Sequence, residues 1–278
     1  MKSATKSKNL QSLWRELEEC RGLFVPEWQQ LGAENLFTAR QGGTSKGAYA
    51  SLNMGLHVED DAQAVIENRR RIAQKLKFDL AQMVYCEQVH GTDIQRVTTQ
   101  QRGAGVFHYH EAIAHTDALI TNEPQVYLTL LFADCIPLFF FDPVTRAIGV
   151  AHGGWKGAWG EIGVKTIAAM QREFGCQVQN VQCWIGPGIG PCCFEIGEDL
   201  AQKVQGRKDW KAYVQVRPDG KYVWDLAHTH EHMLLECGVL PENLLVSTVC
   251  TRCHETEFFS YRRDQGKTGR MAAILGLQ

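Results

Sequence analysis

The sequence of 278 residues lacks several features that mark particular classes of protein. Its longest apolar run, residues 126–141, is interrupted by Asp134 and Pro137, so we expect no membrane-spanning helix. The basic residues 1–8 contain no arginine and precede no apolar segment, so we expect neither a secretory signal nor a transit peptide. The net charge is −2, and we therefore expect no dominant nucleic-acid-binding surface. These expectations together indicate a cytoplasmic protein.

The sequence also lacks internal repeats and low-complexity linkers, so we predict a single domain. Hydrophobic residues make up 44% and charged residues 22%, which is ordinary for a globular protein. A chain of this length can bury a sizeable core. Its ten cysteines are too sparse for a small disulfide scaffold, and we expect them to be mostly reduced thiols, several of them in the core.

The pattern of apolar residues predicts a mixed α/β fold. Helices are expected over residues 61–76, with Asp60 as the N-cap, and over residues 162–174 and 226–237. Apolar residues at helical spacing also predict a short helix over residues 10–20. Strands are expected over residues 126–132, 137–141, 147–151, 181–185, 244–249 and 271–275.

The first three of these strands place two potential metal ligands at the ends of strands. Cys135 follows the first strand, and His152 follows the third. If the three strands form an up-down-up meander, both residues lie at the same edge of the sheet. His90 follows another short apolar stretch, and two imidazoles with one thiolate suit a catalytic zinc with an open fourth position. Asp134, beside Cys135, either orients a ligand or caps the turn.

Cys250-Thr251-Arg252-Cys253-His254 has the spacing of a c-type haem attachment motif. Covalent haem attachment occurs outside the reducing cytosol, so we do not expect haem here. A structural zinc held by Cys250 and Cys253 with Cys192 or Cys193 is one alternative, but the motif alone is incomplete. Buried thiols at a strand end are the interpretation that the sequence favours.

Closely spaced histidines raise the question of copper. His108 and His110 form one pair, and His228, His230 and His232 lie on a predicted helix. Residues two apart on a helix point to different faces, so a solvated helix surface is favoured over a copper site.

Ordered motifs along most of the chain carry a resemblance to a known family. The motifs are Tyr49-x-Ser51-Leu52-Asn53-Met54-Gly55, Asn68-Arg69-Arg70, Gln88-Val89-His90-Gly91, Asp117-Ala118-Leu119-Ile120-Thr121, Ala133-Asp134-Cys135-x-Pro137, Ala151-His152-x-Gly154-Trp155-Lys156-Gly157, Ile185-Gly186-Pro187-Gly188-Ile189-Gly190-Pro191-Cys192-Cys193-x-Glu195, Cys250-Thr251, Phe258-Phe259-Ser260-Tyr261-Arg262-Arg263-Asp264 and Gly269-Arg270. Together they resemble the laccase-domain family, whose members are described as multicopper polyphenol oxidases, purine nucleoside phosphorylases or peptidoglycan editing factors.

The resemblance implies a zinc ion, rather than copper, held by His90, Cys135 and His152. It implies phosphorolysis of adenosine, inosine, guanosine and methylthioadenosine, and deamination of adenosine. It also implies a mixed α/β sandwich over residues 35–278, which leaves residues 1–34 as an N-terminal extension that the spacing predicts to be helical.

Five further residues are candidates for substrate binding. We predict that basic side chains hold phosphate and that an amide bonds a ribose hydroxyl. The basic candidates are Arg69, Lys156, Arg262 and Arg263, and the amide is that of Asn53. Lys156 stands where the family commonly has arginine, so it keeps the charge but loses the bidentate geometry.

Besides a non-enzymatic metal-binding module, three enzymatic alternatives to a zinc phosphorylase remain open from the sequence. Cys135 and His152 could serve as nucleophile and base of an amide hydrolase. A zinc hydrolase could edit peptidoglycan precursors, as one family description implies. A copper-dependent polyphenol oxidase is implied by another.

Overall fold

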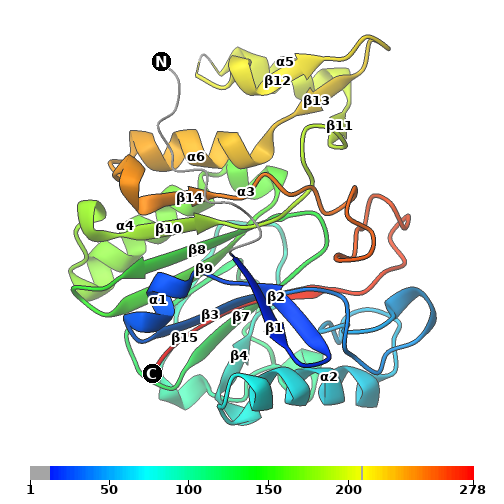
Figure 1. Ribbon diagram of the computed structural model, residues 1–278. Helices are drawn as coiled ribbons and strands as arrows, with labels where there is room; N and C mark the ends of the chain where they lie inside the picture. The colour runs from blue at the N-terminus through cyan, green and yellow to red at the C-terminus, as the bar shows by residue number, and fades with distance from the viewer. Residues whose placement is uncertain (1–12, 208) are drawn as a thin grey trace.

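The computed structural model describes residues 13–207 and 209–278. Two mixed β-sheets pack face to face, and helices cover their outer faces (Figure 1). The first sheet has the strand order β1 (Trp14–Leu17), β2 (Cys20–Leu23), β3 (Ala33–Thr38), β15 (Met271–Leu277), β7 (Tyr127–Phe132) and β4 (Met83–Tyr85). The second has the order β14 (Leu244–Val246), β10 (Gln182–Ile185), β8 (Ile136–Asp142), β9 (Ala147–Gly153), β6 (Ala118–Thr121) and β5 (Ile94–Arg96).

Helices lie on both sides of the two sheets (Figure 1). α2 (Ala62–Lys75) lies below the first sheet in that view, and α6 (Leu226–Glu236) lies above the second. α4 (Ile162–Phe174) packs against β9 and β6 of the second sheet and against α6. The shorter helices are α1 (Pro26–Gln30), α3 (Trp155–Trp159) and α5 (Glu198–Gly206). The predicted single-domain mixed α/β sandwich is confirmed. In the described part of the chain, no helix is both long and apolar enough to cross a bilayer.

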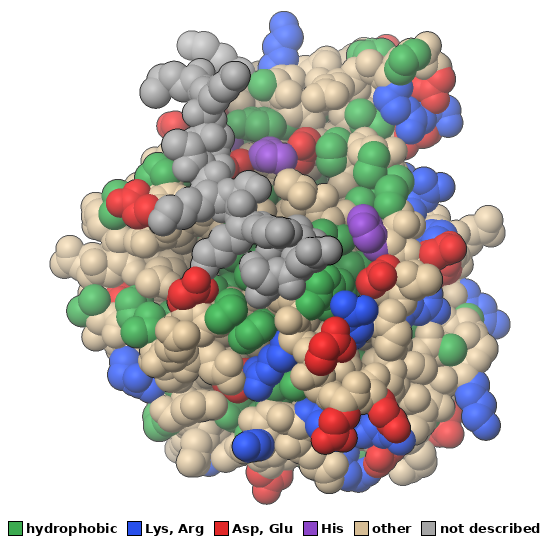
Figure 2. Space-filling view, viewed as in Figure 1, with side chains coloured by type: hydrophobic (Ala, Val, Ile, Leu, Met, Phe, Trp, Pro, Cys, Tyr) green, Lys and Arg blue, Asp and Glu red, His purple; other side chains and the backbone are tan. Residues whose placement is uncertain are grey.

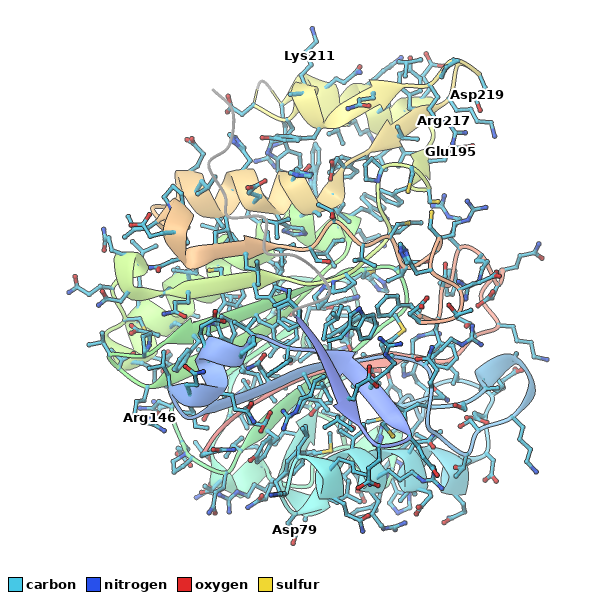
Figure 3. All side chains as sticks on the ribbon, in the orientation of Figure 1. Asp79, Arg146, Glu195, Lys211, Arg217 and Asp219 are labelled. Atoms are coloured by element: carbon cyan, nitrogen blue, oxygen red, sulfur yellow. The ribbon has the colours of Figure 1, made fainter. Side chains whose placement is uncertain are left out.

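A small sheet extends the molecule beyond α6. It consists of β11 (Glu195–Ile196), β13 (Tyr222–Trp224) and β12 (Val214–Val216), in that order. Arg217 contacts Glu195 at 3.2 Å and Asp219 at 2.8 Å, and Figure 3 labels these three side chains. Charged side chains of both signs are also interspersed over the lower part of the face in Figure 2, which agrees with the small net charge of −2.

The central strands are apolar throughout because both of their faces are covered. Side chains from the inner faces of the two sheets form a shared core that includes Phe132, Phe139 and Val150. The outer face of the second sheet packs against α4 and α6. The long apolar run therefore reflects strands buried on both sides.

The three central strands do not form the predicted meander. β7 belongs to the first sheet, whereas β8 and β9 pair in the second. The chain passes from one sheet to the other at residues 133–135, where Asp134 has a positive φ of 88°. β7 and β9 face each other across the core, and the rings of Phe132 and His152 lie 5.4 Å apart. The ends of the two strands therefore still meet, although in different layers.

The predicted helix over residues 10–20 is wrong for the residues that the structure describes; residues 10–12 lie outside them. β1 and β2 form an antiparallel hairpin in which Leu17 pairs with Cys20, and β2 continues the sheet through β3. Leu17 and Cys20 pack against the apolar side of α2, while Leu23 packs into the core between the sheets. The apolar spacing that suggested a helix is thus satisfied by a hairpin.

The other predicted helices are confirmed, with one corrected cap. α2 begins at Ala62 rather than Asp61, and its N-cap is Asp61, whose side chain accepts the backbone N–H of Gln63. Asp60 instead accepts a hydrogen bond from the Asn53 side chain at 2.9 Å.

Candidate metal centre

His90, Cys135 and His152 lie together at one end of the sandwich. Each offers a ligand atom, and these atoms all lie within 4.8 Å of one another. The two imidazole rings are 4.7 Å apart between centroids. Cys135 lies at the crossover between the sheets, His152 is near the end of β9, and His90 is in the loop after β4. Three segments that are distant in sequence therefore converge on one point.

Asp117 connects two of these residues. Its carboxylate lies 2.9 Å from Nδ1 of His152 and accepts the backbone N–H groups of Val89, His90 and Gly91 at 3.2, 3.0 and 2.7 Å. It is fully buried. Burial raises the pKa of Asp117, but the hydrogen bonds from His152 and the loop outweigh burial and lower it. Nδ1 of His152 is thus engaged, which leaves Nε2 for a metal.

The predictions did not assign this role to Asp117. It precedes β6, and the register of β6 against β9 places Ala118 opposite Ala151, so Asp117 lies beside His152. The signals in the sequence are an acidic residue at the start of an apolar strand and its place at the head of the motif Asp117-Ala118-Leu119-Ile120-Thr121.

Asp134 has a different function from either of the two that were predicted for it. It accepts hydrogen bonds from Thr251 Oγ1 at 2.7 Å, Ser260 Oγ at 3.0 Å and the backbone N–H of Arg262 at 2.7 Å. Asp134 therefore fixes the C-terminal segment that carries Arg262 beside the crossover.

The electrostatics favour a thiolate at Cys135. Burial raises the pKa of the Cys135 thiol, but the adjacent His152 and His90 outweigh burial and lower the pKa to about 6. Burial lowers the pKa of His152, but Cys135 and Asp117 outweigh it and raise the pKa to about 9. A thiolate is both the form that binds soft metals and the form that attacks as a nucleophile.

The backbone after His152 must be free of side chains. A Cβ atom at Gly154 would lie 3.0 Å from Sγ of Cys135 and 3.4 Å from Cδ2 of His90. Glycine at this position therefore allows the chain to pass close to the candidate ligands.

The three residues open into a cavity of about 440 Å³. This volume lies in the usual range for small-molecule sites. Its aromatic lining residues are Tyr109, Trp155, Phe194 and Tyr261, and its arginines are Arg262 and Arg270. Aromatic faces suit a planar base, and guanidinium groups suit phosphate.

Arg262 is the one predicted substrate-binding residue that lines this cavity. Lys156 is exposed on α3, where its Nζ lies 5.7 Å from the centroid of the Trp155 ring. The side chain of Arg263 lies outside the cavity lining and is engaged by Asp264 at 2.8 and 2.9 Å and by the Phe258 carbonyl at 3.1 Å. Arg263 therefore braces its own loop instead of facing the site.

Arg69 and Asn53, two of the predicted substrate-binding residues, are buried and lie outside the cavity lining. Arg69 donates to the Met54 carbonyl at 3.0 and 2.8 Å and to the carbonyls of Gly105 and Val106 at 2.7 Å each. Asn53 accepts the backbone N–H of Arg270 at 2.9 Å through Oδ1. These two side chains therefore make hydrogen bonds within the fold.

Arg270 is a cavity residue that the predictions missed. Its side chain donates to the carbonyls of Thr268 and Gly269 at 2.8 and 3.1 Å, which orients it near the Tyr261 ring. Only its place beside Gly269 in a family motif singled it out in the sequence.

The histidine pairs considered for copper do not join this centre. His108 and His110 stack on each other in an exposed turn, with ring centroids 5.6 Å apart. His228 is bonded to Asp225 at 2.7 Å, and His230 is buried against the Gly153 carbonyl at 3.2 Å. His228 and His232, the pair for which a solvated helix face was favoured, are half-buried, whereas His230 on another face of the helix is buried.

Comparison with known proteins decides the family. A family model described as "Multi-copper polyphenol oxidoreductase laccase" matches residues 34–278. The chain belongs to this family. The resemblance that the motifs indicated is thereby confirmed.

Curated relatives within the laccase-domain family are named as phosphorylases. The chain is 42% identical over 247 residues to "Purine nucleoside phosphorylase YlmD" of Geobacillus stearothermophilus, covering 88% of this chain and 90% of the relative. It is 31% identical over 256 residues to "Purine nucleoside phosphorylase YfiH" of Escherichia coli, covering 92% and 98%. The crystal structure of YlmD from Geobacillus stearothermophilus superposes with a TM-score of 0.90 at 39% identity, covering 96% of this chain and 99% of that one.

Proposed function

We propose that this laccase-domain protein is a zinc-dependent purine nucleoside phosphorylase that acts on adenosine, inosine, guanosine and methylthioadenosine and also deaminates adenosine. The observation that carries the proposal is the convergence of His90, Cys135 and His152 at the base of a cavity lined by aromatic residues and arginines. The names of the relatives support the same class of reaction.

The donor set fits zinc. Two imidazoles and one thiolate within 4.8 Å of one another form a three-ligand set of borderline softness, which leaves a fourth position for water or substrate. When bound, zinc supplies a Lewis acid that polarises an oxygen ligand and lowers the pKa of water to about 7. Oxygen-preferring cations would not choose this set.

The chain's own residues bind and orient the substrates. Asp117 holds the His152 ring and the backbone of the His90 loop, so the His152 imidazole is oriented before substrate arrives. Tyr109, Phe194 and Tyr261 offer faces on which a purine base can stack.

Arg262 and Arg270 supply positive charge for phosphate, which must reach the sugar carbon that bears the base. In phosphorolysis the phosphate oxygen forms a bond to that carbon as the bond to the purine nitrogen breaks, and the base leaves with a proton. In deamination, water attacks the amino-bearing purine carbon and ammonia leaves. The same cavity can serve both reactions if the base binds in two orientations.

A cysteine hydrolase is the second candidate, and one observation favours it. Cys135, His152 and Asp117 lie in the order nucleophile, base and orienting carboxylate, and the pKa of Cys135 is lowered to about 6. An amide bond in a peptidoglycan precursor is the substrate class that such a site would take. Enzyme stripped of metal would keep this activity, whereas the phosphorylase would lose its own.

Reaction products distinguish these functions. Purified protein is incubated with adenosine in the presence and absence of phosphate, and adenine, inosine and hypoxanthine are followed together with metal content. Phosphate-dependent release of adenine, with one zinc at this centre, supports the proposal. Oxygen uptake with several coppers per chain would show the polyphenol oxidase instead, and release of no base with phosphate would exclude the phosphorylase.

We also propose a cytoplasmic location. The cysteines that the structure describes are free thiols, as expected in a reducing compartment. Fractionation of the source cells would test this.

A further inference from the structure

Cys192, Cys193, Cys250 and Cys253 form a second cluster of potential ligands. Their four sulfur atoms all lie within 4.8 Å of one another. The first two belong to the loop between β10 and β11, and the other two belong to the loop between β14 and β15. Cys193 and Cys250 are buried, whereas Cys192 and Cys253 are exposed. The sequence had favoured buried thiols in the motif of Cys250 and Cys253, which is confirmed for Cys250 and wrong for the exposed Cys253.

The spacing of the sulfur atoms suits a single tetrahedral ion. Sγ of Cys253 lies 3.4 Å from Sγ of Cys193 and 3.6 Å from Sγ of Cys192. With Zn–S bonds of about 2.3 Å, the edges of a ZnS₄ tetrahedron are about 3.8 Å long. A disulfide would need sulfur atoms about 2.05 Å apart. The observed distances are thus close to those of a four-cysteine zinc centre.

Hydrogen-bond donors reach the sulfur atoms of Cys193 and Cys250. The backbone N–H of Gly190 donates to Sγ of Cys250 at 3.2 Å, and Nη1 of Arg252 donates to Sγ of Cys193 at 3.3 Å. Such donors disperse the negative charge that four thiolates place around a divalent ion. A Cβ atom at position 190 would lie 3.2 Å from Cβ of Cys250 and 3.4 Å from Sγ of Cys192, so glycine leaves room for the sulfur atoms.

Backbone contacts bring the two loops together independently of the sulfur atoms. Gly188 and Cys250 form a parallel β-bridge, and the backbone N–H of Thr251 donates to the Gly188 carbonyl at 2.9 Å. Within the second loop, the backbone N–H of Cys253 bonds the Cys250 carbonyl at 3.2 Å, which turns both sulfur atoms toward the first loop. The cluster is therefore preorganised by the fold.

We propose that these four cysteines bind a structural Zn²⁺ ion at a second metal site, separate from the centre formed by His90, Cys135 and His152. Four protein ligands leave no open coordination position, which is typical of structural zinc. Its role is to clamp two loops that form a wall of the cavity. The first loop contributes Ile189 and Phe194 to that wall, and the second leads into Tyr261 and Arg262.

One contact shows how the clamp reaches the site. Nη1 of Arg262 donates to the Glu195 carbonyl at 3.0 Å, two residues after Cys193. Figure 3 labels Glu195, at the start of β11, where the first loop ends. A zinc that holds Cys192 and Cys193 therefore also fixes the carbonyl that positions Arg262.

Metal stoichiometry tests this proposal separately from the proposed function. The full-length protein is loaded with Zn²⁺ under reducing conditions, freed of excess metal and analysed by elemental mass spectrometry. We expect two zinc ions per chain in the wild type. Cys192→Ser/Cys253→Ser changes exposed residues and should fold, and it should hold one zinc. His90→Ala should also hold one, and the combined variant none. Cys237→Ser, a cysteine outside both clusters, should retain two.

Cobalt provides a second readout that identifies the ligands. The His90→Ala variant loaded with Co²⁺ should show the intense thiolate-to-cobalt bands of a four-sulfur site, and Cys192→Ser/Cys253→Ser should abolish them. The proposal is overturned if the loaded wild type and the double-serine variant contain the same amount of zinc. It is also overturned if intact mass spectrometry shows a disulfide among these cysteines in the zinc-loaded protein. Neither result would bear on the centre at His90.

Discussion

The carboxylate of Asp117 lies 2.9 Å from Nδ1 of His152 and also accepts the backbone N–H of His90 at 3.0 Å. One buried acid thus orients two of the three candidate ligands, although it coordinates nothing itself. Because the amide that replaces it in Asp117→Asn cannot accept all of these hydrogen bonds, we expect the zinc affinity of the centre to fall about 10- to 100-fold. Competition with a chelator of known affinity measures this change. Asp199→Asn, on the exposed surface of α5, is the control and should bind as the wild type does. An unchanged affinity in Asp117→Asn would remove this residue from the centre.

Arg262 is expected to hold phosphate. Loss of a hydrogen bond to a charged group costs about 1.5–3 kcal/mol, so Arg262→Ala should raise the KM for phosphate roughly 10- to 100-fold. Deamination of adenosine, which needs no phosphate, should change much less. Lys156→Ala, which removes a positive charge outside the cavity lining, should leave both reactions near wild-type rates. If Lys156→Ala and not Arg262→Ala raised the KM, phosphate would bind elsewhere.

Arg69 is expected to stabilise the fold without contacting the substrate. Its guanidinium is buried and donates hydrogen bonds to three backbone carbonyls. Arg69→Met would leave these carbonyls without a donor. We expect a loss of about 3–5 kcal/mol in the free energy of unfolding, measured by urea denaturation. Arg70→Met, at an exposed position of the same helix, should cost less than about 0.5 kcal/mol. A raised KM for phosphate in folded Arg69→Met protein, with unchanged stability, would contradict this assignment.

His230 makes stability fall in acid. Burial lowers the pKa of His230 to about 4. The hydrogen bond to the Gly153 carbonyl opposes this shift, and the nearby His152 adds slightly to it. Unfolded, this histidine titrates near pH 6.5. Between these values the unfolded chain binds the proton and the folded chain does not, so stability is full above about pH 6.5 and declines as the pH falls toward about 4.

The size of this effect follows from the shift in pKa. It corresponds to on the order of 3 kcal/mol, and His230→Gln should remove that part of the pH dependence. Urea denaturation at about pH 7.5 and about pH 5 should capture about 2 kcal/mol of it, because the rest develops only as the pH falls toward about 4. His110→Gln, in an exposed turn, should leave the slope as it is. Equal slopes in the wild type and His230→Gln would show that this histidine is protonated in the folded chain.

Much of the fold could be predicted because several segments carry unambiguous patterns. The helix over residues 162–174 has apolar residues along one face and is observed with those bounds as α4. The hairpin of β1 and β2 was missed because Leu17 and Cys20 fit a helical spacing and also the two sides of a tight turn. Apolar runs likewise do not reveal which sheet a strand joins, so the crossover between β7 and β8 was not foreseen.

In the candidate site, too, some residues could be predicted from local sequence and others could not. His90, Cys135 and His152 stood out because imidazoles and a thiol followed apolar strands. Asp117 was missed because its place depends on the pairing of β6 with β9, which local sequence does not show. Arg69 was predicted to bind substrate because a buried arginine that bonds backbone carbonyls looks the same in sequence as one that binds phosphate.

The dependence of phosphorolysis on zinc at His90 tests the central claim most directly. Wild-type protein and His90→Ala are loaded with Zn²⁺, and zinc content and phosphate-dependent release of adenine from adenosine are measured on the same samples. The proposed mechanism predicts that His90→Ala lacks one zinc ion and loses adenine release, and that chelated wild type recovers activity when zinc is restored. Adenine release at the wild-type rate from His90→Ala, or from fully chelated wild type, would contradict it.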